Sequence, residues 1–354
     1  MKRRVLVAMS GGVDSSVAAA LVAERGDEAV GVTMKLLARA DTGFGCCGSP
    51  ADVDDAKRVA EKLGIVHYVS DMAEVFSSKV IRPYLDAYLG GTTPNPCVEC
   101  NPSLKFGHLL ALAEAWGCDK VATGHYARVE GGRLLKSLDP GKDQSYFLHS
   151  LDARALSRAD FPVGSLSKDA VRAKARELGL KTADKPESME TCFVPGRDVR
   201  GFVAAHADAG APGLKPGPIR DRSGRELGRH TGLASYTVGQ RSGLGLSGPE
   251  PRYVVALDPA ENAVIVGGAD ETWSRAITIG AVSWTGRREA PARAEVRVRH
   301  RHAPAPATLT TRADGVLTAV FDEPQRAPAP GQAAVFYSGD EVLGGGTILR
   351  GGDA

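Results

Sequence analysis

The chain has 354 residues, of which 43% are hydrophobic and 24% charged, and its formal net charge is +2. This length exceeds one typical domain, so two or three domains with real cores are expected. The small net charge excludes a global basic field, so any nucleic-acid surface has to be a local patch. The absence of an apolar run of about 18 residues and of an apolar leader argues against a membrane helix and predicts a cytoplasmic protein.

A glycine turn near the N-terminus carries the first chemical signal. The apolar residues 5–9 are typical of a buried strand, and the Ala-rich stretch after Val17 has helical spacing up to Gly26. Between them stands Ser-Gly-Gly-Val-Asp-Ser-Ser, at residues 10–16. A strand, a glycine turn and a helix start surround a phosphate with unpaired backbone N–H groups. Because Gly-Lys-Ser/Thr is absent, the kinase-type phosphate loop is excluded, and an ordinary α/β turn is the alternative.

The first 125 residues alternate strand and helix patterns. Further strands are predicted at residues 29–34, 65–69 and 120–125, and helices at residues 52–63 (capped by Asp52), 73–89 and 104–116. The Pro-rich residues 90–102 predict a loop, residues 126–137 a hairpin, and residues 167–178 a helix. This alternation predicts an α/β fold with a doubly wound parallel sheet, whose ligand crevice lies at the carboxyl ends of the strands.

After about residue 205 the pattern changes to short β-type runs separated by turn sequences. Two small β domains fit this pattern, with a break near residues 271–274. In the second of them Arg293, Arg297, Arg299 and Arg301 alternate with other residues, which predicts one basic strand face. Such a face suits phosphate contacts, and a plain solvated face is the alternative.

Six cysteines stand at positions 46, 47, 97, 100, 118 and 192. In a large chain of cytosolic type, metal or catalytic use outranks a structural disulfide. Cys97 and Cys100 form a Cys-x-x-Cys pair, which suits half a zinc site, a redox pair or half an iron–sulfur site. Cys192 lies between polar residues and a Phe-Val-Pro turn, whereas Cys118 opens a strand and is predicted to be plain core.

Several motifs, taken together and in order, resemble one family. They are Ser-Gly-Gly-Val-Asp-Ser at 10–15, Thr-Pro-Asn-Pro-Cys-x-x-Cys-Asn at 93–101, Ala-Thr-Gly-His-Tyr-Ala at 122–127, Lys-Asp-Gln-Ser-Tyr-Phe at 142–147, Cys-Phe-Val-Pro at 192–195, Gly-Gln-Arg-x-Gly-Leu-Gly at 239–245 and Pro-Gly-Gln-x-Ala-Val-Phe-Tyr at 330–337. The first is similar to the PP-loop of ATP pyrophosphatases. The whole set resembles the bacterial tRNA-specific 2-thiouridylases over essentially the full chain.

The resemblance implies an N-terminal PP-loop domain at residues 1–204, a central β domain at 205–272 and a C-terminal, tRNA-binding β-barrel at 273–354. It implies a tRNA-uridine 2-sulfurtransferase that uses ATP, with Mg²⁺, to adenylate the 2-oxygen of the wobble uridine. Sulfur then replaces this oxygen, and AMP and pyrophosphate are released. The implied partners are tRNAs with anticodons such as those for Lys, Glu and Gln, and a sulfur-donor protein, either a cysteine desulfurase or a relay carrier. No membrane is involved.

The same resemblance implies roles for three cysteines. Cys192 carries a persulfide and attacks the activated carbon, and Cys100 resolves it through a transient Cys100–Cys192 disulfide. Cys97 stands where some members have an aspartate that acts as acid or base. This opens a second mechanism, in which Cys97, Cys100 and Cys192 hold a 4Fe–4S cluster that delivers the sulfur, and thiolate triads suit both routes.

Binding residues are carried over in the same way. The resemblance assigns to ATP the positions Ala8, Met9, Ser10, Gly11, Gly12, Val13, Asp14, Ser15, Met34 and Gly124. It assigns to tRNA the positions Asn95, Pro96, Cys97, His125, Lys142, Asp143, Gln144, Arg301, His302 and Gln332. From the residues alone, Met34 suits core packing better than ligand binding, and Asp14 is a candidate magnesium ligand.

Some features depart from the family or favour other classes. Pro102 stands where the family usually has a basic residue, and Thr191 replaces a usual apolar neighbour of Cys192. Residues 243–248 match the dinucleotide pattern Gly-x-Gly-x-x-Gly, but without a strand-to-helix context they predict a loop. Amidotransferase-type synthetases and argininosuccinate synthase share the PP-loop but need ammonia or an amine, and the thiols argue against them. An ATP-gated tRNA-binding module without catalysis would need neither thiols nor pyrophosphate release.

Overall fold

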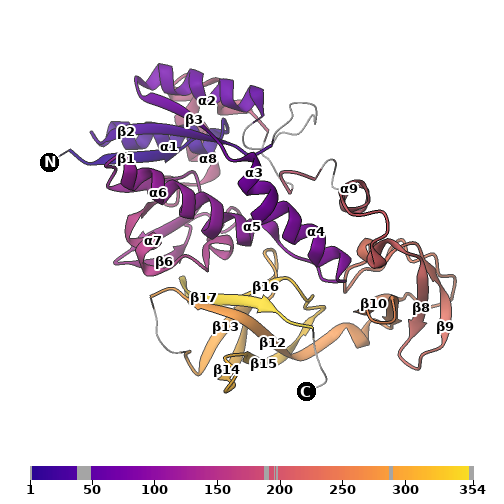
Figure 1. The fold of residues 1–354 in the computed structure, drawn as a ribbon. Helices are drawn as coiled ribbons and strands as arrows, with labels where there is room; N and C mark the ends of the chain where they lie inside the picture. The colour runs from indigo at the N-terminus through magenta and orange to yellow at the C-terminus, as the bar shows by residue number, and fades with distance from the viewer. Residues whose placement is uncertain are drawn as a thin grey trace. The chain divides into compact units, whose positions relative to one another are not determined.

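The computed structural model describes residues 2–37, 49–186, 191–194, 196, 198–286 and 290–350 (Figure 1). Cys46 and Cys47 lie outside the described residues. The chain divides into two compact units. The first contains residues 1–80, 97–197 and 340–343, and the second contains residues 81–96, 198–339 and 344–354. Neither unit is one continuous stretch of chain.

The first unit is built on a parallel sheet of the predicted α/β type. Its strand order is β3-β2-β1-β4-β7, and the strands are β1 (Arg4–Ala8), β2 (Glu28–Lys35), β3 (Val66–Asp71), β4 (Lys120–Ala122) and β7 (Ala159–Asp160). In the register of the central strand, Val5 faces Ala29 on one side and Lys120 on the other. The strand order reverses at β1, with β2 and β3 on one side of it and β4 and β7 on the other. The carboxyl ends of β1 and β4 are therefore neighbours at the point where a ligand crevice is expected in such a sheet.

Helices cover both faces of this sheet. They are α1 (Val13–Glu24), α2 (Pro50–Leu63), α6 (Gly107–Ala115), α7 (Ala153–Arg158) and α8 (Lys168–Glu177), with short turns at η3 (Ser145–Leu148) and η4 (Lys181–Asp184). Figure 1 shows α2 on one side of the sheet and α6 on the other. One core joins Val5, Val7 and Met9 to apolar side chains of α1, α2 and α8. Burial of these alternate β1 residues holds the glycine turn that follows the strand.

Two expected helix starts were wrong. Helix α2 begins at Pro50, and its N-cap is Ser49, whose hydroxyl accepts a hydrogen bond from the Asp52 N–H at 3.2 Å. Proline suits the first helical position because its missing N–H has no intrahelical partner there. Residues 96–106, which were expected to be partly loop, are helical: α5 (Pro96–Glu99) is followed by a π-type turn, η2 (Cys100–Phe106). A wider turn accommodates Pro102, which lacks the N–H of a regular α-helical bond.

Residues 73–89 are helical as expected, but in three pieces. These are α3 (Ala73–Phe76), a π-type turn η1 (Ser77–Ile81) and α4 (Arg82–Leu89). The predicted hairpin is present as β5 (Ala127–Glu130) and β6 (Arg133–Lys136), with Gly131 and Gly132 both at positive φ. In the first unit Glu341 pairs with Leu135 of β6.

The second unit contains two β structures, as predicted for the chain after residue 205. The first is a sheet of order β10-β11-β8-β9, formed by β8 (Gly217–Asp221), β9 (Glu226–His230), β10 (Tyr253–Asp258) and β11 (Ala263–Gly267). Helix α9 (Val199–His206) and the turns η6 (Pro212–Leu214), η7 (Leu233–Ser235) and η8 (Asp270–Thr272) belong to the same unit.

The second β structure is a barrel, as predicted. Its strands are β12 (Trp273–Trp284), β13 (Arg293–Arg297), β14 (Ala305–Thr311), β15 (Leu317–Arg326), β16 (Ala333–Ser338) and β17 (Glu341–Ile348). The pairing of β12 with β17 closes it. The predicted basic strand face is shorter than expected, because β13 ends at Arg297 and leaves Arg299 and Arg301 beyond the strand. Within the strand, Arg293 is paired with Asp322.

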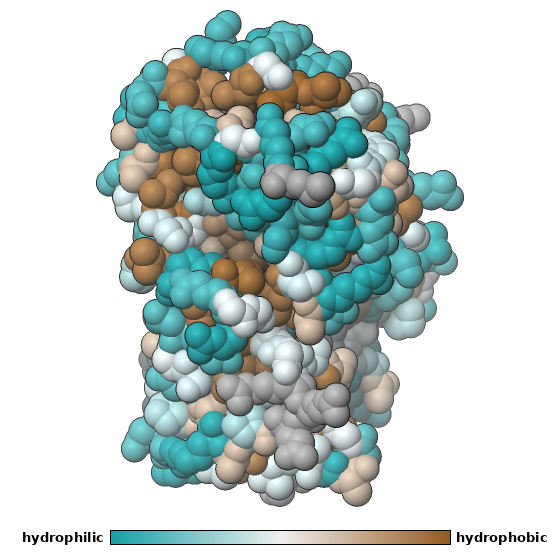
Figure 2. All heavy atoms as spheres, turned by 90° about the vertical axis from the view of Figure 1, so that its left-hand side faces the viewer, coloured by the Kyte–Doolittle hydropathy of each residue, from teal (hydrophilic) through white to brown (hydrophobic). Residues whose placement is uncertain are grey.

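Within the described residues, no helix is both long and apolar enough to cross a membrane. On the face drawn in Figure 2, hydrophobic residues form separate patches between hydrophilic ones.

Candidate functional site

A cavity of about 180 Å³ opens at the carboxyl ends of β1, β2 and β4. The first strand and the glycine turn contribute Ala8, Met9, Ser10, Asp14 and Ser15 to its lining, and later segments contribute Val32, Met34, Lys105, Thr123, Gly124, His125 and Gln144. Most of the positions predicted for ATP, and two of those predicted for tRNA, therefore line one cavity in the first unit. Gly11, Gly12 and Val13 complete the turn but are not part of this lining.

Close backbone packing explains the two glycines that flank the cavity. Gly11 has φ +72°, and a Cβ there would lie 2.2 Å from the backbone oxygen of Asp52. A Cβ on Gly124 would lie 2.6 Å from the Ser15 nitrogen. Both contacts are far below the distance that real Cβ atoms reach, so larger residues would push the turn out of place. The turn and the segment after β4 thus approach each other as backbone against backbone.

The serines of the turn hold its shape. The Ser15 hydroxyl accepts a hydrogen bond from the Ser10 N–H at 3.1 Å and donates one to the Gly12 carbonyl at 3.0 Å. The Ser16 hydroxyl donates to the same carbonyl at 2.8 Å. In the part of the chain described, no side chain caps the N-terminus of α1, whose N-cap is Gly12. The first N–H groups of α1 and the positive end of its dipole therefore remain available to an anion.

Two lysines brace the turn from outside the sheet. The Lys168 ammonium, on a side chain that is only 8% exposed, donates to both carboxylate oxygens of Asp14 at 2.8 and 2.9 Å. The Tyr126 hydroxyl donates to the same carboxylate at 2.8 Å. The Lys185 ammonium donates to the Gly11 carbonyl at 3.1 Å and to Asp52 and Asp55 at 2.7 Å each. Burial lowers the pKa of Lys185, but the two carboxylates outweigh this effect and raise it, so Lys185 stays charged.

His125 brings a neutral ring to the cavity. Burial and the nearby Lys105 charge hold its pKa well below the ordinary value. Its Nδ1 lies 2.7 Å from the Thr123 hydroxyl, and its ring lies beside those of Phe106 and Phe161, at centroid distances of 6.4 and 6.1 Å. An uncharged ring fixed in this way can stack on or hydrogen-bond to a base without contributing charge.

The segments that carry the thiols of Cys100 and Cys192 pack on the same helical turn. Cys100 is buried and begins η2, which contacts α3. Cys192 is half-buried in a turn closed by the Val194 N–H and the Thr191 carbonyl at 2.9 Å. The next residue, Phe193, packs edge-on against Phe76 of α3, with ring centroids 5.6 Å apart. Helix α3 therefore anchors both segments.

The structure does not assemble the ligands of the alternative, cluster-based mechanism. Among the described residues, no group of three or more His, Cys, Asp or Glu side chains is placed to hold a metal ion. Cys97, Cys100 and Cys192 thus do not fit a 4Fe–4S cluster as they stand. Cys118 is 3% exposed, and burial raises its pKa, so it is a core residue as predicted.

Comparisons with known proteins match the chain from end to end. Family models match residues 3–196 as a tRNA methyl transferase HUP domain, residues 210–268 as a tRNA methyl transferase PRC-barrel domain and residues 274–348 as an aminomethyltransferase beta-barrel domain. A tRNA-specific 2-thiouridylase of Syntrophus aciditrophicus is 47% identical over 98% of this chain and 93% of its own length. Those of Sorangium cellulosum and Chloroflexus aurantiacus are each 48% identical over 98% of this chain, and over 92% and 98% of their own lengths.

The chain belongs to the tRNA-specific 2-thiouridylases. The resemblance drawn from the sequence motifs is confirmed, and with it the α/β domain followed by two β domains. The family is that of the tRNA-uridine 2-sulfurtransferases.

Other positions that the 2-thiouridylase motifs single out lie apart from the cavity or serve the fold. The Asp143 carboxylate is buried and accepts hydrogen bonds from the Ser137 and Ser145 N–H groups, both at 3.2 Å, so it shapes the loop rather than facing a ligand. The residues on either side of Asp143 are placed differently. Gln144 lines the cavity, and Lys142 is half-buried.

In the second unit, Gln332 supports the segment that leads to Asn95 and Pro96. Its amide donates to the Thr93 carbonyl at 2.6 Å. Gly331, at φ +90°, would place a Cβ 2.9 Å from the Thr93 nitrogen. Arg301 and His302 follow β13 in a turn, where the Arg297 guanidinium donates to the His302 carbonyl at 2.9 Å.

Sequence reasoning missed Val32, Thr123 and Lys105, which also line the cavity. Val32 and Thr123 could have been found, because they lie in the carboxyl-terminal halves of predicted strands. Lys105 gave no such signal, since it reaches the cavity from the helical segment that was expected to be partly loop.

Proposed function

We propose that this chain replaces the 2-oxygen of a tRNA wobble uridine with sulfur, using ATP, and so forms 2-thiouridine. The observation that carries this proposal is the cavity at the glycine turn, in a chain that tRNA-specific 2-thiouridylases match over nearly its whole length. The substrates are tRNAs with anticodons such as those for Lys, Glu and Gln, and the reaction takes place in the cytoplasm.

In the first half of the reaction, the 2-oxygen attacks the α-phosphorus of ATP and pyrophosphate leaves. The open N–H groups at the start of α1 and the hydroxyls of Ser10 and Ser15 suit the phosphates, and Met34 and Gly124 border the adenosine. Mg²⁺ typically enters such sites through one or two carboxylates together with the phosphates, and Asp14 is the carboxylate in this lining. Adenylation converts the uridine oxygen into part of a good leaving group, AMP.

In the second half, a persulfide on Cys192 supplies the sulfur. Its outer sulfur attacks C2 of the adenylated uridine, a C–S bond forms, and the C2–O bond breaks as AMP leaves with the oxygen. The Cys100 thiolate then attacks the inner sulfur of Cys192. The S–S bond breaks, sulfur remains on C2 as a thiocarbonyl, and a Cys100–Cys192 disulfide forms. The thiol protons pass to solvent, and a dithiol reductant restores both thiols.

The packing of both thiol segments on α3 supports a reaction between Cys100 and Cys192. The persulfide itself comes from a sulfur-donor protein, a cysteine desulfurase or a relay carrier, whose own persulfide becomes a thiol. Cys97 precedes Cys100 by about one helical turn and is proposed to assist proton transfer. We also propose that residues 1–204 carry the chemistry, that residues 205–272 form a central domain, and that residues 273–354 bind tRNA through Arg301, His302 and Gln332.

The test uses purified protein, unmodified tRNA, Mg-ATP and a persulfide source under anaerobic conditions, with the iron content measured. The tRNA is digested, and its nucleosides are examined by mass spectrometry. ATP-dependent 2-thiouridine formed by iron-free protein is the expected result. If no 2-thiouridine forms from folded protein, the proposed function fails. Activity that appears only with bound iron would reject the persulfide route and would require Cys97, Cys100 and Cys192 to rearrange into a cluster site.

A further inference from the structure

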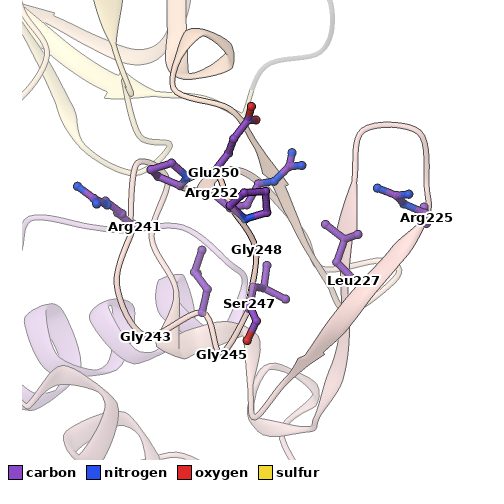
Figure 3. Close-up of a pocket in the computed structure, with 13 residues that line it drawn as sticks. Arg225, Leu227, Arg241, Gly243, Gly245, Ser247, Gly248, Glu250 and Arg252 are labelled. Carbon is purple, nitrogen blue, oxygen red and sulfur yellow. The ribbon is translucent and has the colours of Figure 1, made fainter.

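A second and larger cavity, of about 560 Å³, lies in the sheet that contains β8–β11 (Figure 3). Figure 3 shows two contributors to its wall: the β8–β9 hairpin, which carries Arg225 and Leu227, and the loop of residues 241–252. This loop includes the Gly-Leu-Gly-Leu-Ser-Gly sequence at 243–248, to which neither the fold nor the proposed reaction gives a role.

Positive charge gathers around this cavity. Arg225, Arg241 and Arg252 line it, against the single acid Glu250. Arg225 is paired with Asp221, whereas Arg241 and Arg252 have no ion-pair partner in the part of the chain that the structure describes. In Figure 3 the Glu250 carboxylate points away from the glycine loop. Figure 3 draws Arg241 and Arg252 on opposite sides of the loop, so two separate guanidinium groups are left, and each can attract a phosphate.

The loop adds backbone donors to this charge. Within the described ranges, none of the backbone N–H groups of residues 241–248, 250 and 252 makes a backbone hydrogen bond, and Pro249 and Pro251 have no N–H. Gly243 and Gly245 are at φ +76° and +66°, so the backbone there is bare of side chains. Leu244, between them, is buried in the core with Tyr236 and Val254, which fixes the loop. A fixed run of unpaired N–H groups beside cations is a typical phosphate-binding arrangement.

From these observations we propose that the loop of residues 241–252 binds backbone phosphates of the substrate tRNA, with Arg241 and Arg252 as the main contacts. This inference rests on the proposed function, because it names a further surface for the same substrate. Guanidinium forks and backbone N–H groups recognise phosphate oxygens without reading base sequence. A hollow of this size also suits a sugar–phosphate unit better than the flat surface of a protein partner.

The test compares the double variant R241Q/R252Q with the wild type in binding to unmodified tRNA at several salt concentrations. We expect affinity to fall about tenfold or more, and the slope of log K against log salt to become shallower by roughly 2, about one for each lost phosphate contact. ATP binding should not change. Because Arg241 is exposed and Arg252 half-buried on a loop, both substitutions are compatible with folding, which circular dichroism checks.

The matched control is R222Q/R229Q, which removes two arginines of the same β domain that are already paired, with Glu271 and Glu226. It should alter tRNA affinity less than twofold. Unchanged affinity and slope in R241Q/R252Q would overturn the inference, and so would an equal loss in the control. If tRNA affinity is kept but sulfur transfer from the donor protein slows, the surface binds that protein instead. Failure of the wild type to form 2-thiouridine is a different result, which rejects the proposed function itself.

Discussion

At the scale of single residues, the Asp14–Lys168 pair is the most consequential feature of the cavity. Asp14 is the carboxylate of the cavity lining, where the phosphates and Mg²⁺ are proposed to bind, so its position matters. Lys168 and Tyr126 hold this carboxylate through hydrogen bonds at 2.8–2.9 Å. Lys168 is nearly buried and Asp14 half-buried, so removing one partner leaves the charge of the other poorly compensated.

Replacing Lys168 by Met should therefore reduce tRNA-dependent pyrophosphate release by roughly 10- to 100-fold, since the Asp14 carboxylate then loses the partner that fixes it beside the phosphates and Mg²⁺. K168R keeps the charge and should retain part of the rate. The control is K174M on the same helix, because Lys174 pairs with Glu24 and Glu177 and does not line the cavity. Equal rates of pyrophosphate release in K168M and K174M would contradict this role.

The residues of the glycine turn could be predicted from the sequence, but the two lysines that hold the turn in place could not. Ser10, Asp14 and Ser15 could be predicted because strand, glycine turn and helix follow one another in the chain. Lys168 and Lys185 could not, since they lie more than 150 residues along the chain from the turn, and only the packing of α8 and its following turn on α1 brings them close. Long lysines give no periodic signal of their own.

At the scale of elements, α3 acts as a support for the two thiol segments. The Phe193 ring is 3% exposed and packs against Phe76, which is fully buried. This contact lies one residue from Cys192 and helps to hold its turn. The Phe76–Phe193 pair is therefore one support of the Cys192 turn.

Replacing Phe193 by Ala should loosen this turn and reduce 2-thiouridine formation much more than pyrophosphate release, because the glycine-turn cavity is left intact. A Phe-to-Ala change in a core costs about 3–5 kcal/mol, so folding is checked by thermal unfolding. F193L keeps most of the apolar volume and should restore sulfur transfer. Parallel loss of both activities in folded F193A would show that the contact has no specific role.

The element most poorly predicted was the one that carries Cys97 and Cys100. Pro94, Pro96 and Pro102 in a polar stretch favour a loop. The structure instead uses Pro96 at the first turn of α5 and accommodates Pro102 in a π-type turn. Local propensity was overridden because Leu104 and Phe106 are buried in the first unit, which requires a helical approach.

At the scale of the whole molecule, the two-unit division could not have been predicted. Domain boundaries were expected along the chain, but residues 340–343 belong with the first unit and residues 81–96 with the second. The sequence pattern predicts where strands and helices alternate. It does not predict a long-range pairing such as that of Glu341 with Leu135. The parallel sheet and the barrel could be predicted because their patterns are local.

Buried and half-buried histidines make the stability of the first unit depend on pH. Burial lowers the pKa values of His67, His108 and His125, and lowers that of His149 to about 4. The unfolded chain takes up these protons near pH 6.5, so stability is complete above that pH and falls as the pH drops toward the folded values. For His149 alone the loss at pH 5 is about 2 kcal/mol.

The temperature of calorimetric unfolding should therefore be lower at pH 5 than at pH 7.5. In H149Q the difference between the two pH values should be smaller, because one of the titrating groups is gone. An unfolding temperature that is the same at both pH values would show that these rings are not buried in their neutral form.

The account as a whole states that adenylation and sulfur transfer are separate steps, with Cys192 needed only for the second. The most direct test measures pyrophosphate and 2-thiouridine from the same reactions of wild type and C192S, with unmodified tRNA, Mg-ATP and a persulfide source. We predict that C192S releases pyrophosphate in a tRNA-dependent manner and forms no 2-thiouridine. Formation of 2-thiouridine by C192S at the wild-type rate would contradict the account.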